Sequence, residues 1–86
     1  MEKSLKNFEV FAVRYHNNLL FYSDCIQYAF EELLDQSLRF PQVVLEGKVD
    51  GEWIGLVTAT EDDMFVMDSA KEYEDELIKA SPIVLM

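Results

Sequence analysis

The residues best able to take part in chemistry are a run of carboxylates in the second half of the chain. Eight acids fall within the sixteen residues from 61 to 76, offset by one base, Lys71. These acids are Glu61, Asp62, Asp63, Asp68, Glu72, Glu74, Asp75 and Glu76. Carboxylates can bind Ca²⁺, but the 61–63 segment lacks the alternating Asp-x-Asp-x-Asp-Gly pattern of a calcium loop. An anionic surface that binds a basic protein is therefore our leading hypothesis.

The spacing of these acids suggests a sharper version of that hypothesis. On a helix, which rises about 1.5 Å per residue, such a run approaches the charge density of duplex DNA, about one charge per 1.7 Å. The composition is similar to that of small acidic phage and mobile-element inhibitors of restriction or CRISPR systems, which act as DNA mimics. This analogy is compositional and rests on no sequence motif. The alternative is that the acids only solubilise the protein, since acids near a helix amino terminus also interact favourably with its dipole.

The other reactive residue types give little support for catalysis. Cys25 is the only cysteine, which excludes an intramolecular disulfide and a cysteine-based zinc site. His16 is the only histidine and lies in an expected turn. The sequence therefore gives little support for a Ser-His-Asp catalytic triad. The three glycines follow neither the Gly-x-Gly-x-x-Gly nor the P-loop pattern. We therefore expect a protein that is not an enzyme, with no metal and no cofactor.

Composition narrows the class of partner. The 86 residues are 50% apolar, which predicts one folded domain over residues 1–86. The net charge of −10 is uneven: residues 1–43 carry six acids and four bases (−2), and residues 44–86 carry eleven acids and three bases (−8). Such a chain repels nucleic acid and anionic membranes. No apolar run is long enough for a membrane span, and none at the amino terminus suits a signal peptide. We expect a cytoplasmic protein whose partner is a protein with a basic surface.

Two β-hairpins must position these residues. The first joins apolar runs at 8–15 and 19–23 through a turn at His16, Asn17 and Asn18. The second joins 43–49 to 52–60 through Asp50-Gly51, a favoured type I′ pair because both positions need a positive φ. After an acidic turn, 63–67 returns as a further strand.

Two helices follow strands directly. The spacing of Ile26, Phe30, Leu33 and Leu34 predicts a helix over about 24–37, with Asp24 as N-cap and Gln27 completing a capping box. Ser69 and Glu72 form a second capping box, although alignment of the two helices would put that cap at Asp68 instead. Ala70, Tyr73, Leu77 and Ala80 share one face of this second helix. Residues 83–86 are short and apolar and predict a final edge strand.

These elements predict an α+β fold built from two hairpin-helix repeats. Residues 11–36 align without gaps on 55–80, which defines repeat-like units 8–37 and 52–80. The element order is ββα-ββ-βαβ, a mostly antiparallel sheet with both helices on one face. The two units differ in charge, because the second has an acidic turn where the first has His16, Asn17 and Asn18.

The second face of the sheet raises an alternative function. A sheet with one solvated face should alternate apolar and polar residues, and the first strand does not. Phe11, Val13 and Tyr15 point one way, while Phe8 points the other. We therefore consider a structural homodimer that pairs through an apolar sheet face, with Phe8, Phe11 and Trp53 as interface candidates.

Overall fold

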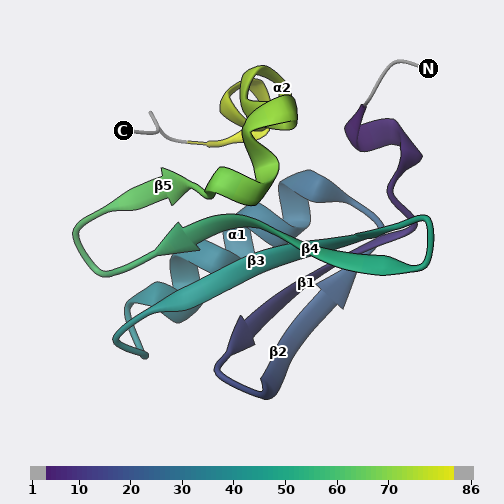
Figure 1. Ribbon diagram of the computed structural model, residues 1–86. Coiled ribbons are helices and arrows are strands. Elements are labelled where there is room, and N and C mark those ends of the chain that lie inside the picture. The colour runs from purple at the N-terminus through teal and green to yellow at the C-terminus, as the bar shows by residue number, and fades with distance from the viewer. Residues whose placement is uncertain (1–3, 83–86) are drawn as a thin grey trace.

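The protein is an antiparallel sheet with helices packed against it. The computed structural model describes residues 4–82, and within them five strands form one sheet in the order β2-β1-β3-β4-β5 (Figure 1). The strands are β1 (Val10–Tyr15), β2 (Asn18–Ser23), β3 (Val43–Val49), β4 (Glu52–Ala59) and β5 (Met64–Val66). The helices are α1 (Ile26–Ser37) and α2 (Glu74–Ala80), with 3₁₀ helices η1 (Leu5–Asn7) and η2 (Asp68–Tyr73). The α+β class is confirmed, whereas the strand predicted at 83–86 lies outside the described residues.

The hairpin turns follow from local backbone preferences. Asp50 and Gly51 have φ angles of 53° and 78°, so the β3–β4 turn has the positive φ values that the Asp-Gly pair predicts. In the β1–β2 hairpin Tyr15 pairs with Asn18, which leaves a two-residue turn. The residue with a positive φ there is His16 (54°) rather than an asparagine.

The predicted start of the first helix is wrong by about two residues. Strand β2 continues to Ser23, and α1 begins at Ile26 with Cys25 as its N-cap. Ser23 Oγ accepts a hydrogen bond from the Cys25 amide at 3.1 Å, and Cys25 Sγ donates to Gln27 Oε1 at 3.3 Å. The Asp24–Gln27 capping box therefore does not form.

The second helix is broken where the sequence predicts a continuous one. The Met67 amide donates to the carbonyl of Leu56 at 2.9 Å, so the chain still follows β4 at that point. Ser69 Oγ donates to the carbonyl of Gly55 at 2.6 Å instead of capping a helix. Residues 68–73 form η2, which is kinked at Ala70 (φ −116°, ψ 16°), and the α-helical part starts only at Glu74.

One core joins both helices to one face of the sheet. Strand residues Phe11 and Val13 pack there with Phe30 of α1 and Leu77 of α2, all at most 3% exposed. In Figure 1, α1 lies behind the sheet and α2 stands above it. Phe8 belongs to the same core, stacked on Phe11 at 5.6 Å and edge-on to Tyr73 at 5.0 Å between ring centroids. Both rings are thus inside the monomer, which corrects their choice as interface residues.

The β1–β2 and β4–β5 hairpins, each of which leads into a helical segment, occupy opposite edges of the sheet, with β3 between them. The first segment, α1, is a regular helix of 12 residues, while the second segment is 3₁₀ before its 7 α-helical residues. The proposed relation between units 8–37 and 52–80 stays a prediction. No helix among residues 4–82 is long and apolar enough to cross a membrane.

Candidate functional site

The face of the sheet that points away from the core carries the largest set of exposed apolar side chains. Residues paired across neighbouring strands lie on the same face. The pairs Arg14–Leu19, Ala12–Tyr22, Lys48–Trp53 and Thr58–Phe65 define this face, because their strand neighbours Phe11, Val13, Leu45 and Val57 all point into the core. We call it the open sheet face. Its strand residues are Val10, Ala12, Arg14, Leu19, Tyr22, Val44, Glu46, Lys48, Trp53, Gly55, Thr58 and Phe65.

Four large apolar residues are exposed on the open sheet face. Tyr22 is 67% exposed, Leu19 48%, Phe65 44% and Trp53 42%. They come from three strands, β2, β4 and β5, so they span the sheet from one edge to the other. The fold of the monomer does not require large apolar side chains to be exposed on this face. Several of them on one face are typical of an interaction surface.

An ion pair and an aromatic ring lie together on this face. Arg14 Nε donates to Glu46 Oε1 at 2.6 Å, and the Arg14 guanidinium lies 5.3 Å from the centroid of the Trp53 ring. Both charged side chains are only about a quarter exposed, at 28% and 26%. Arg14 therefore reaches across β3 to β4, and its guanidinium contacts both Glu46 and the Trp53 ring.

The sequence predicted only one member of this surface, Trp53. Tyr22, Phe65 and Leu19 were missed. Leu19 and Tyr22 are three residues apart and share this face only because the β1–β2 register shifts between Val13 and Arg14, which strict alternation does not predict. The Arg14–Glu46 pair was missed because it depends on the β1–β3 register, in which Ala12 lies opposite Glu46. That register joins segments more than thirty residues apart in the sequence.

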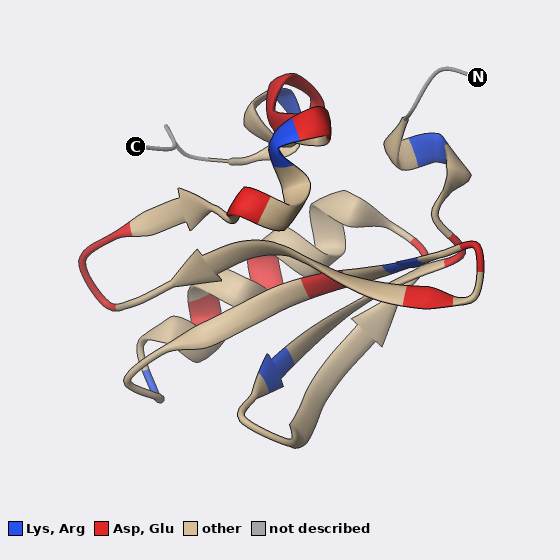
Figure 2. Ribbon diagram, in the orientation of Figure 1, with Lys and Arg blue, Asp and Glu red and all other residues tan. Residues whose placement is uncertain are grey.

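The predicted acidic residues fall into two groups rather than one. Glu61, Asp62 and Asp63 form the β4–β5 turn, while the other five lie on η2 and α2. Figure 2 shows the two groups at separate places on the molecule. Glu61 and Asp62 line an open hollow of about 420 Å³ together with Arg39, at the carboxyl end of α1.

Two of the eight acids, Glu76 and Glu74, are half-buried and accept hydrogen bonds from other side chains. Glu76 accepts from Ser4 Oγ at 3.1 Å and from the Leu5 amide at 3.3 Å, so it holds η1 against α2. Glu74 accepts from Lys71 Nζ at 3.1 Å. The other six, Glu61, Asp62, Asp63, Asp68, Glu72 and Asp75, are exposed. These six are the acids that face solvent and define the anionic surface from here on.

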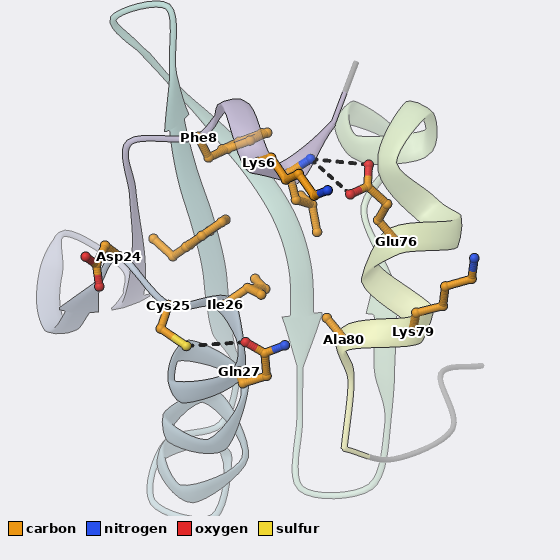
Figure 3. A pocket seen from close by; sticks show the side chains of 11 residues that line it. Lys6, Phe8, Asp24, Cys25, Ile26, Gln27, Glu76, Lys79 and Ala80 are labelled. Atoms are coloured by element: carbon orange, nitrogen blue, oxygen red, sulfur yellow. Dashed lines mark hydrogen bonds between the residues drawn. The ribbon is translucent and has the colours of Figure 1, made fainter. Parts of the chain in front are cut away.

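A second hollow, of about 620 Å³, lies between η1, the start of α1 and α2 (Figure 3). Its floor is apolar, with Leu5, Phe8, Phe11 and Ile26. Cys25 lies at its edge and donates to Gln27. His16 is in the β1–β2 turn and does not line this hollow, so it supplies no base for the thiol. The arrangement contains no nucleophile paired with a base.

Two further properties of the described residues concern metal binding and buried polar atoms. Across residues 4–82, no group of three or more His, Cys, Asp or Glu side chains is placed to hold a metal ion. Over the same range, every buried side-chain nitrogen and oxygen has a hydrogen-bond partner. A buried polar atom without a hydrogen-bond partner can mark a site where a ligand binds. The unexplained features therefore lie on the surface.

Comparison with protein-family models, with curated proteins and with solved structures gives no match for the chain. The surface chemistry of the chain itself is the basis for assigning a function.

Proposed function

We propose that this protein is a non-enzymatic binding module that docks a protein partner onto its open sheet face. The observation that carries the proposal is the exposure of Leu19, Tyr22, Trp53 and Phe65 on one face, around the Arg14–Glu46 pair. Aromatic rings at the centre of an interface and arginine held by an acid are typical of the residues that dominate protein–protein binding. A folded domain has no need of this arrangement for its own core.

The charges on this face favour protein over nucleic acid as the partner. Binding of single strands on an aromatic sheet requires several cations that follow the phosphate backbone. Among the strand residues of the open sheet face only Arg14 and Lys48 are cationic, and Arg14 is bonded to Glu46. The chain as a whole carries −10. Both facts oppose a polyanionic ligand.

Site-specific photo-crosslinking tests the proposal. A photoreactive phenylalanine analogue at Tyr22 or Phe65 is expected to give protein adducts in cells, because both positions would lie in the interface. The matched controls are Tyr28 on α1 (61% exposed) and Ile78 on α2 (45% exposed), which should give none. Adding Trp53→Asp should remove the adducts, because burying an unpaired carboxylate costs at least about 2 kcal/mol. Adducts that form equally from positions 28 and 78 would contradict the proposal.

A second candidate is the inhibitor hypothesis, in which the six exposed acids bind a basic protein surface. Its support is that these acids face solvent and that only Lys71 stands among them in the sequence. The sharpest version is a DNA-mimic inhibitor of a nucleic-acid-processing or defence complex. The division into two groups means that such a partner would contact either the β4–β5 turn or the η2–α2 surface first.

Two charge-reversal variants separate these surfaces. One changes Glu61, Asp62 and Asp63 to Lys, and the other changes Asp68, Glu72 and Asp75 to Lys. Each moves the net charge by +6, from −10 to −4, so the long-range attraction falls equally in both. We leave Glu76 unchanged because it anchors η1.

Binding to a basic partner captured at low salt should fall about 100-fold in the variant that loses the contact and much less in the other. The measurement is the dissociation constant by calorimetry at two salt concentrations. Wild-type affinity in both variants would rule out the acidic surface as the binding site.

A further inference from the structure

We infer that the partner of the open sheet face is a second copy of this chain. This rests on the proposed function, because it names the occupant of the same surface. In the dimer two sheets pack face to face, with the helices of both copies on the outside. Three observations carry the inference: the charge of the face, its area, and the position of the acids.

The open sheet face is almost neutral in a strongly anionic chain. Its strand residues include one acid, Glu46, and two bases, Arg14 and Lys48, which sum to +1. The chain as a whole carries −10. A basic partner would be drawn to the acidic turn and helix rather than to this face. A copy of the same face meets it without excess charge, and it supplies both signs for pairing across a twofold axis.

The area of the face agrees with a small but specific interface. Five strands about 4.8 Å apart, each about six residues long at about 3.3 Å per residue, cover roughly 24 Å by 20 Å, or about 500 Å². Two copies would together bury about 1,000 Å², the lower limit for a specific interface. Contacts at the low end of the size range are commonly transient, so we expect a dimer that forms reversibly.

The five acids on η2 and α2 do not oppose this arrangement. Residues of η2 and α2 pack on the core face of the sheet, and packed sheets lie about 10 Å apart. The acids on η2 and α2 of one copy are thus separated from those of the other by two sheets and two helical layers. That distance exceeds the Debye length of about 8 Å at physiological ionic strength. The residual repulsion between two anionic copies should weaken further as salt rises.

This gives the dimer a salt dependence of opposite sign to that of a complex with a basic partner. Raising NaCl from about 50 mM to about 500 mM shortens the Debye length from roughly 14 Å to roughly 4 Å. An apolar contact between like-charged copies becomes tighter under this change. A contact between the acids and a basic protein becomes weaker.

Analytical ultracentrifugation of the full chain tests the inference. From about 1 µM to about 500 µM we expect a monomer–dimer equilibrium with a micromolar Kd that decreases as salt rises. Phe65→Asp and Trp53→Asp should each raise Kd by roughly 100-fold, because each would bury a carboxylate without a partner. Ile78→Asp is the matched control, since Ile78 is exposed to the same degree on α2, and it should leave Kd unchanged.

The outcomes separate this inference from the proposed function. The inference is overturned if the chain stays monomeric at all concentrations. Pairing through the open sheet face is also overturned if a dimer survives Phe65→Asp or dissociates at high salt. If the chain is monomeric but positions 22 and 65 still crosslink to another protein, the open sheet face is a binding surface for a different partner. If neither self-association nor crosslinking occurs, both proposals are wrong. Circular dichroism of each variant confirms that it is folded.

Discussion

Phe11→Asp is expected to unfold the protein. Phe11 is 3% exposed and its ring stacks on Phe8, within the core that joins the sheet to both helices. The substitution removes a buried aromatic ring and places a carboxylate in an apolar site. Together these changes cost more than about 4 kcal/mol. A domain of this length is stable by roughly 4–13 kcal/mol, so the variant should retain little or no cooperative unfolding transition in urea.

The contrasting variant is Trp53→Asp on the open sheet face. It loses the contact with the Arg14 guanidinium, worth about 0.5–1 kcal/mol at an exposed site, but it creates no buried charge in the monomer. Its urea midpoint should therefore lie close to that of the wild type. If Phe11→Asp unfolds at the same urea concentration as the wild type, the assignment of Phe11 to the core is wrong.

Gly47→Ala is expected to be the most damaging single-methyl change in the sheet. A Cβ atom at position 47 would overlap Cδ2 of Phe8 and lie 2.6 Å from its Cε2. The Phe8 ring cannot rotate away, because Phe11 and Tyr73 hold it on two sides. Overpacking of this kind costs about 2–3 kcal/mol, which should lower the midpoint of thermal unfolding by more than about 8 °C.

Gly55→Ala provides the control for that prediction. Its Cβ would lie 2.7 Å from Met67 Sδ, and a methionine side chain has three rotatable bonds through which it can move aside. We expect a cost below about 1 kcal/mol. Equal destabilisation by the two substitutions, measured by thermal unfolding under the same conditions, would mean that Phe8 does not fix the space above Gly47.

Elements specified by nearby residues could be predicted from the sequence. The Asp50-Gly51 turn is one example, because its backbone angles depend on the two residues themselves. The apolar face of α1 is another, since Phe30 and Leu33 are buried as their spacing predicts. Helix starts were less predictable. Ser69 could cap a helix locally, but its hydroxyl donates instead to the carbonyl of Gly55, fourteen residues away.

The site was less predictable than the fold. Alternation in β1 shows that Phe11 and Val13 share a face, but both faces of that strand begin with apolar residues. Only tertiary packing decides which face the helices cover. Extended to Phe8, the alternation predicts a ring that points away from Phe11. Because β1 begins only at Val10 and Phe8 ends η1, its ring instead stacks on Phe11 in the core.

The bond between Ser4 and Glu76 has a consequence for how the chain folds. It joins residues 72 positions apart, so it closes a loop that contains nearly the whole described chain. The entropy of closing such a loop is recovered only after the sheet has brought its ends together. We therefore expect this contact to form late in folding and to open before the sheet does. The Leu5 amide, which also donates to Glu76, reports local opening of η1 and α2, whereas the amides of β1 and β3 report unfolding of the whole molecule.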